Sequence, residues 1–150
     1  MNFGIYNFKN QIYKTKRKSK KGVKMENQKR LIVEMGMGVD QHGHDDDCTK
    51  AAIKAIKNAI SNNCLPGLVE ICELKTPKEL LSMQVHIKIG APFPDTINKK
   101  KVLKAVPFGE KKLHVVKGGL LAKGIQIKEL GDTSDQMIIC NAAVTVSIKD

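Results

Sequence analysis

The sequence predicts an α+β fold, a two-layer sandwich in which a mixed sheet carries two helices on one face. Three patterns lead to this prediction. Apolar residues recur at helical spacing over 48–62, alternate at strand spacing over 83–89, and form a long β-rich stretch over 137–148. The expected order is β-α-β-α-β-β, with the last strands not separated by a helix. Because the helices cover one face, we expect oligomerisation to cover the other.

The first strand and the first helix carry the clearest signals. Residues 31–33, Leu-Ile-Val, form an apolar run that is typical of a strand, which we expect to end at the glycines that follow. Three aspartates at 45–47 then precede the helix over 48–62, and we expect one of them to cap it. Ile53, Ile56 and Ile60 form its apolar stripe.

The later elements are marked by turn residues and by shorter patterns. Residues 68–80 favour neither a helix nor a strand, and they contain a turn at Thr76-Pro77. The other predicted elements are a strand over 83–89, a helix over 96–106, a strand over 113–116, a short edge strand over 125–127 and a long strand over 137–148.

Charge divides the chain into two parts. The 150 residues carry a net charge of +11, and eight of these charges come from residues 1–24, which contain no acid. We therefore expect residues 1–28 to be a basic N-terminal extension and residues 29–150 to form a single α+β domain. The extension has four interpretations: a disordered tail, a product of an upstream start codon before Met25, an organellar transit peptide, or an arm that binds nucleic acid or a membrane surface.

Composition limits the location and the partners of the protein. No apolar run approaches the ~20 residues of a membrane span. The first 25 residues contain no apolar h-region, so we do not expect a secretory signal. We expect a cytoplasmic protein with no membrane partner, or an organellar one if residues 1–24 are a transit peptide. Lysine greatly exceeds arginine, which indicates genome composition more than selection for nucleic-acid contacts. Four cysteines without C-x-x-C spacing are expected to be reduced, buried and inert: Cys48, Cys64, Cys72 and Cys140.

The stretch between the first strand and the first helix concentrates the candidate functional residues. Its glycines are Gly36, Gly38 and Gly43, its acids are Asp40 and Asp45, and its imidazoles are His42 and His44. The two acids and two imidazoles suit a metal site. Alternatively, Asp40 orients His42 in an acid–base pair, or glycine N–H groups and the helix N-terminus bind an anion. In the structural interpretation, the glycines only make a turn.

Two residues from later strands are candidates to complete this site. Lys117 precedes Gly118-Gly119, a turn that could accept a phosphate. Asn141 lies within an apolar strand, where a buried amide would need a partner. The sequence leaves the cofactor open, and G-x-G without a third glycine at the required place does not match the dinucleotide-binding fingerprint.

The string G-x-G-x-D-x-H-G, supplied by Gly36, Gly38, Asp40, His42 and Gly43, resembles the signature of a family of conserved hypothetical proteins of bacteria and plants. Residues 49–52, 63–67, 106–109 and 141–146 resemble the same family, so the resemblance covers about 29–148. It implies the fold of the C-terminal domain of tubulin-type GTPases, a chorismate-mutase-like fold, and no particular activity. Small proteins of that wider group form trimers with ligands between subunits, which is an analogy only.

Three hypotheses about function follow. The first is a homo-oligomeric protein or enzyme that binds a small molecule, an anion or a metal at the first strand–helix turn. In it, Asp40 and His42 supply the acid–base or ligand groups, and the ligand-binding residues are Gly36, Gly38, Gly43, Asp45, Lys117 and Asn141. The second is a non-catalytic homo-oligomeric structural or assembly protein. The third is nucleic-acid binding by the basic extension.

Overall fold

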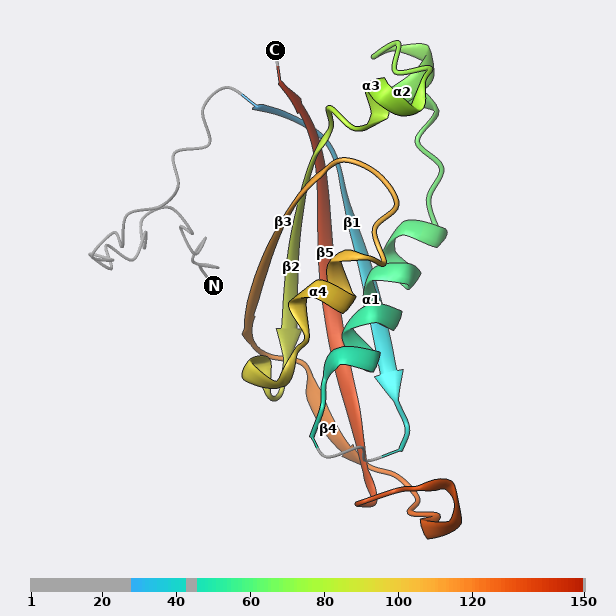
Figure 1. Ribbon diagram of the computed structural model, residues 1–150, viewed down its shortest axis with the longest axis vertical. Coiled ribbons are helices and arrows are strands. Elements are labelled where there is room, and N and C mark those ends of the chain that lie inside the picture. The colour runs from blue at the N-terminus through green and yellow to red at the C-terminus, as the bar shows by residue number, and fades with distance from the viewer. Residues whose placement is uncertain (1–27, 43–45, 150) are drawn as a thin grey trace, which may run out of the picture.

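A five-stranded mixed sheet forms one layer of the protein, and helices pack on one of its faces (Figure 1). The computed structural model describes residues 28–42 and 46–149. The strands are β1 (Gln28–Asp40), β2 (Gln84–Ala91), β3 (Glu110–Lys117), β4 (Leu120–Lys123) and β5 (Gln136–Lys149). The helices are α1 (Thr49–Ser61), α2 (Pro66–Glu70), α3 (Pro77–Leu80) and α4 (Lys99–Leu103), with 3-10 turns at Pro94–Thr96 and Lys128–Leu130. The predicted α+β fold class is confirmed.

Strand β5 is the centre of the sheet. The strand order is β1-β5-β2-β3, and β4 also pairs with β5. β5 runs antiparallel to β1, β2 and β4, whereas β2 and β3 are parallel. The sheet is therefore mixed, as the sequence predicts, and three strands form hydrogen bonds with β5.

Helix α1 packs across β1 and β5 and supplies one wall of the core (Figure 1). Its face toward the sheet carries Ala51, Ala55, Ile56 and Ala59, all fully buried. The predicted helix over 48–62 is thus confirmed to within one residue at each end. The N-cap residue is Cys48, which makes no side-chain cap, so the expectation that an aspartate of 45–47 caps the helix is wrong. Asp47, one residue earlier, accepts a hydrogen bond of 2.8 Å from the Thr49 N–H.

The expectation that the first strand ends at the glycines is wrong. β1 continues through Gly36 and Gly38 to Asp40. A Cβ atom at Gly36 would lie 2.8 Å from the Ala59 Cα, and one at Gly38 would lie 2.7 Å from the Lys54 Cβ. These glycines therefore do not make a turn. They let the backbone of α1 approach the backbone of β1.

Other boundaries also differ from the prediction. The expected helix over 96–106 is only Lys99–Leu103, because Asn98 starts it by accepting a hydrogen bond from the Lys101 N–H. Residues 125–127 are not a strand. The strand of this region is β4, which begins immediately after Gly119, and the φ of +71° at Gly119 makes the turn before it. The Ile127 N–H donates to the Asp132 side chain and not to a neighbouring strand.

The face of the sheet opposite α1 carries exposed apolar side chains. Val33, Met35 and Met37 of β1 and Leu120 of β4 have exposed fractions between 48% and 63%. We call the face that carries these side chains the open face. The expected N-terminal extension at 1–28 lies outside the described residues apart from its last position, which begins β1. No helix in the part of the chain that the structure describes is long and apolar enough to span a membrane.

Candidate functional site

Asp40 closes β1 at the start of the candidate site, and its side chain is only 1% exposed. The Lys50 ammonium, from the first turn of α1, lies 3.2 Å from the Asp40 Oδ1. One turn later, the Lys54 ammonium donates a hydrogen bond of 2.6 Å to the Val39 carbonyl oxygen. Two lysines of α1 therefore reach across to the end of β1, and the Asp40 carboxylate is held within an ion pair at the base of the loop.

His42 follows Asp40 and forms the second feature of the site. Its Nδ1 lies 2.9 Å from Oδ1 and 3.1 Å from Oδ2 of Asp132. The imidazole is 36% exposed, whereas the Asp132 side chain is fully buried. The sequence predicts Asp40 as the carboxylate that orients this imidazole, but the structure places Asp132 on Nδ1. Asp40 pairs with Lys50 instead.

The connection between β4 and β5 brings Asp132 to His42. This connection extends beyond the end of β1 in Figure 1 and contains the 3-10 turn Lys128–Leu130. Gly131 ends that turn at a φ of +86°, which reverses the chain and directs it back toward the sheet. The Asp132 carboxylate also accepts a hydrogen bond of 2.7 Å from the Ile127 N–H. A backbone N–H group therefore holds the Asp132 carboxylate in place independently of the His42 imidazole.

The start of α1 is already satisfied by protein groups. The Cys48 N–H donates to the Thr96 hydroxyl at 3.1 Å, and the Thr49 N–H donates to Asp47. The Thr49 hydroxyl in turn accepts from the Asn98 N–H at 2.9 Å. Two of the donors that an anion at this helix end would use are therefore occupied, so these observations do not favour the anion interpretation.

Three predicted site residues, Gly43, His44 and Asp45, lie outside the described residues. Among residues 28–42 and 46–149, no three histidine, cysteine, aspartate or glutamate side chains form a group that could hold a metal ion. The predicted metal set includes His44 and Asp45, so the metal interpretation stays a prediction. Gly36 and Gly38 lie beneath α1, where close packing explains them without a ligand.

Lys117 and Asn141 lie together, but in a different place. Both line a hollow of about 220 Å³ whose other walls include Met35, Lys88 and Gly90. Neither Asp40 nor His42 lines this hollow. Asn141 is exposed, so solvent can satisfy its amide and the expectation of a buried amide that needs a partner does not apply. The structure therefore brings Lys117 to Asn141, and His42 to Asp132, as two separate groups.

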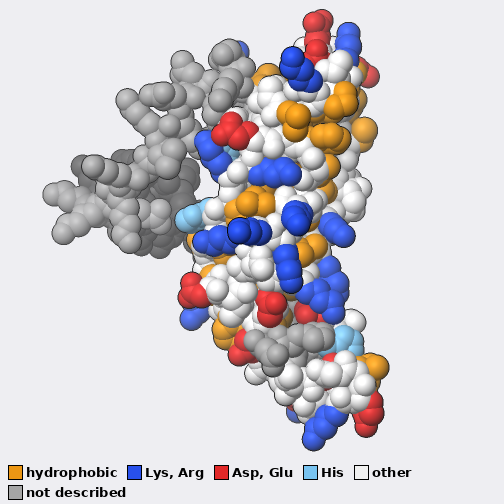
Figure 2. All heavy atoms as spheres, in the orientation of Figure 1, with side chains coloured by type: hydrophobic (Ala, Val, Ile, Leu, Met, Phe, Trp, Pro, Cys, Tyr) orange, Lys and Arg blue, Asp and Glu red, His pale blue; other side chains and the backbone are white. Residues whose placement is uncertain are grey.

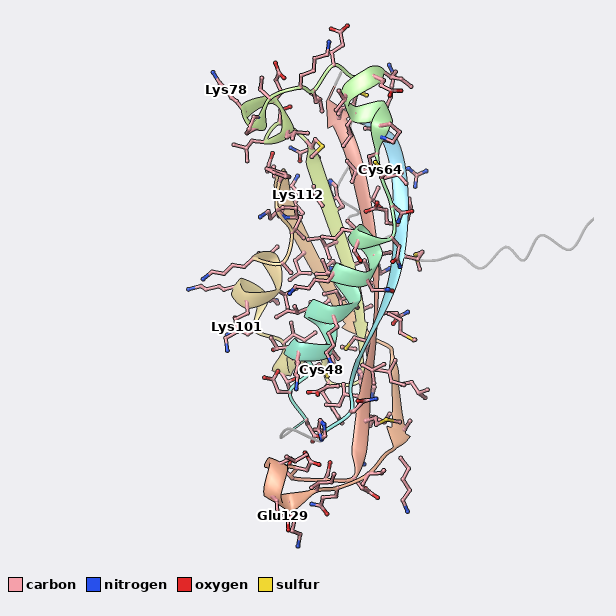
Figure 3. All side chains as sticks on the ribbon, turned by 90° about the vertical axis from the view of Figure 1, so that its right-hand side faces the viewer. Cys48, Cys64, Lys78, Lys101, Lys112 and Glu129 are labelled. Carbon is pink, nitrogen blue, oxygen red and sulfur yellow. The ribbon has the colours of Figure 1, made fainter. Side chains whose placement is uncertain are left out.

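All four cysteines are free thiols, as expected. Cys48 and Cys140 are fully buried. Burial raises the pKa of the Cys140 thiol to about 12, and the neighbouring Cys48 adds to the effect. Cys64 departs from the prediction, because it is exposed in the segment between α1 and α2 (Figure 3). Cys72 is half-buried.

Sequence reasoning missed Asp132. It follows a glycine in a segment without periodicity, which is typical of a turn, and it stands 90 positions from His42. Nothing in a single sequence connects the two residues. The only available signal was an acidic residue next to a glycine in a long connection, and this is too common to indicate a site.

Comparison with known proteins gives the chain a family. No curated protein matches it. A solved structure of an FtsZ-like protein of unknown function from Nostoc punctiforme is similar at 44% sequence identity and a TM-score of 0.71, covering 82% of this chain and 98% of that one. Residues 30–146 match the conserved hypothetical proteins of the Lin0512 family. The chain therefore belongs to the Lin0512 family of conserved hypothetical proteins.

Proposed function

We propose that this protein is a homo-oligomer that binds a small molecule at the junction of β1 and α1, as a binding protein or as an enzyme in which His42 moves a proton. The observation that carries the proposal is the pairing of a partly exposed imidazole with the fully buried Asp132 carboxylate. A carboxylate at Nδ1 holds the proton on that nitrogen and leaves Nε2 as the basic atom of the ring.

The neighbouring charges suit such a site. Asp132 has a backbone donor at 2.7 Å, so its position does not depend on the imidazole. Asp40, two residues before His42, forms an ion pair with Lys50. We assign His42 the acid–base role, Asp132 the positioning role, and Asp40 a structural role through Lys50. Lys117 and Asn141 are left out, because the hollow that they line contains neither Asp40 nor His42.

A thermal-shift screen of metabolites and metal ions tests this proposal, because a ligand that binds only the folded state raises its melting temperature. A ligand of this site should stabilise the wild type and the His114→Ala variant, and should fail to stabilise His42→Ala. His114 is an exposed histidine of β3 and serves as the matched control. The assignment is refuted if every hit stabilises His42→Ala as strongly as it stabilises the wild type.

The open face supports a second candidate, a non-catalytic homo-oligomeric assembly protein. Met35 and Met37 are 63% and 59% exposed on adjacent positions of that face, where a second copy would bury them. Light scattering tests it: Met35→Lys should dissociate the oligomer, and Ile71→Lys, which changes an 82% exposed residue at the end of α2, should not. A monomeric wild type would refute both this candidate and the oligomeric part of the first.

The finer points of fold and location belong to the same proposal. We propose a distant likeness to the C-terminal domain of tubulin-type GTPases, which the FtsZ-like description of the Nostoc punctiforme protein supports. We also propose a cytoplasmic location, or an organellar one if residues 1–24 are a transit peptide.

A further inference from the structure

An apolar cavity of about 400 Å³ lies at the other end of α1 from the His42–Asp132 pair. It opens where α1 has ended at Ser61 and the chain passes through an extended segment into α2 and α3 (Figure 1). Figure 2 shows hydrophobic side chains gathered over this end of the molecule. Its apolar walls include Ile60 of α1, Leu68 of α2, Leu80 of α3, Val85 of β2, and Val144 and Val146 of β5.

The volume and the construction of the cavity are those of a small-molecule site. A volume of about 400 Å³ falls within the range of roughly 300–1,000 Å³ that is typical of ligand pockets. Its floor is the rigid sheet, where Val85, Val144 and Val146 are at most 5% exposed. Its roof is made by α2 and α3, short helices that contribute no fully buried residue. A preformed floor under a lightly packed roof allows entry.

One carboxylate lies in this apolar lining. Glu34 of β1 is 4% exposed, lines the cavity, and pairs across the sheet with Val144. No hydrogen bond or ion pair joins its carboxylate to another side chain within residues 28–42 and 46–149, and its oxygens are not among the fully enclosed polar atoms that lack a partner, so the carboxylate opens into the cavity. The nearby amide of Asn63 is engaged, because it donates to the Ala59 carbonyl oxygen at 2.9 Å. Burial raises the pKa of Glu34 above its ordinary value.

A carboxylate that opens into a cavity and has no side-chain partner is available to a ligand. The walls around Glu34 are mostly apolar and do not supply a donor of their own. The ligand would carry an apolar body that fits the valine and leucine walls, and one donor that reaches the carboxylate.

We propose that the cavity around Glu34 is a second binding site, for a small molecule with an apolar body and a single hydrogen-bond-donating head, either an amine or an alcohol. Glu34 is the specificity-determining residue of this site. An ammonium head forms an ion pair with the ionised carboxylate, and a hydroxyl head donates one hydrogen bond to it.

Benzylamine, benzyl alcohol and toluene are suitable probes, since they share one ring and differ in the head. At pH 8 we expect benzylamine to raise the melting temperature of the wild type and to bind Glu34→Gln at least tenfold more weakly by calorimetry. Toluene should bind both proteins equally. The matched control is Glu70→Gln, an exposed acid of α2, which should bind all probes as the wild type does. If benzyl alcohol binds the wild type more tightly than benzylamine does, the ligand belongs to the alcohol class. If benzylamine binds more tightly, the ligand belongs to the amine class.

Cys64 gives a second measurement that needs no variant, because this exposed cysteine lines the cavity and Cys72 does not. Benzylamine should slow the alkylation of Cys64, as followed by peptide mass spectrometry, and leave that of Cys72 unchanged. The proposal is overturned if no probe protects Cys64 in the wild type. It is also overturned if both benzylamine and benzyl alcohol bind Glu34→Gln as tightly as the wild type.

Discussion

Replacing Gly38 with alanine tests how closely α1 lies against β1. The added Cβ would stand 2.7 Å from the Lys54 Cβ, and closer still to the Ala51 carbonyl oxygen and the Ala55 amide nitrogen. Ordinary contact begins at 3.4 Å, so the helix must recede by at least 0.7 Å. A gap of that size removes roughly a quarter to a half of each dispersion contact along the interface.

The expected cost follows from the rigidity of the atoms involved. Two of the three obstructing atoms belong to the helix backbone, so no side-chain rotation relieves the overlap. We therefore expect the upper end of the usual range for overpacking, about 3 kcal/mol of unfolding free energy. For a domain of this size, that corresponds to a melting temperature lower by about 10 °C.

Urea denaturation of Gly38→Ala measures this, and Gly67→Ala is the control. Gly67 lies in α2, and a Cβ there would find its nearest atom, the Ile71 Cδ1, at 3.7 Å. Alanine at Gly67 should leave stability unchanged or raise it by up to about 1 kcal/mol. If the two variants unfold within about 0.5 kcal/mol of each other, which is the usual range for a substitution that disturbs no packing, the close approach of α1 to β1 does not explain the glycine.

Three further predictions concern buried groups. Asp132→Ala removes the acceptor of the Ile127 N–H and should lower the unfolding free energy by about 1–3 kcal/mol, as measured in urea. Glu34→Gln should stabilise the protein at pH 7. Because the raised pKa of Glu34 makes ionisation costly only in the folded state, this gain should vanish as the pH falls below the ordinary value of 4.5 in urea titrations at several pH values. Finally, a thiol reagent at pH 8 should modify exposed Cys64 within the folded protein and Cys140 only upon unfolding, since the Cys140 pKa is about 12; equal rates would contradict this.

Local patterns predict most of the fold. The stripe of Ile53, Ile56 and Ile60 places α1 to within a residue at each end, and the alternation that starts at Met83 places β2. Both signals arise because burial repeats with the period of the element, so a single sequence contains them. The short helices α2 and α3 have no buried residue, and this explains why residues 68–80 show no clear period.

The candidate site was harder to predict, because its geometry depends on contacts that are distant in sequence. Glycine permits both turns and close packing, so the sequence alone does not distinguish a turn at Gly36 and Gly38 from close packing there. Ala51, Ala55 and Ala59, four residues apart on α1, form the complementary small surface that could have indicated packing. His42 was predicted as a site residue from its position, but its partner Asp132 lies on another connection that only the fold brings near.

The central position of β5 has a consequence for how the chain reaches its native state. β1, β2 and β4 are all synthesised before the strand that joins them, and paired residues such as Gly36 and Ala142 are more than a hundred positions apart. Contacts of this range must be closed against chain entropy before they stabilise anything, so folding is slow for the size of the domain. Until β5 is synthesised, β1 lacks its sheet partner, and unpaired strand edges of this kind favour aggregation.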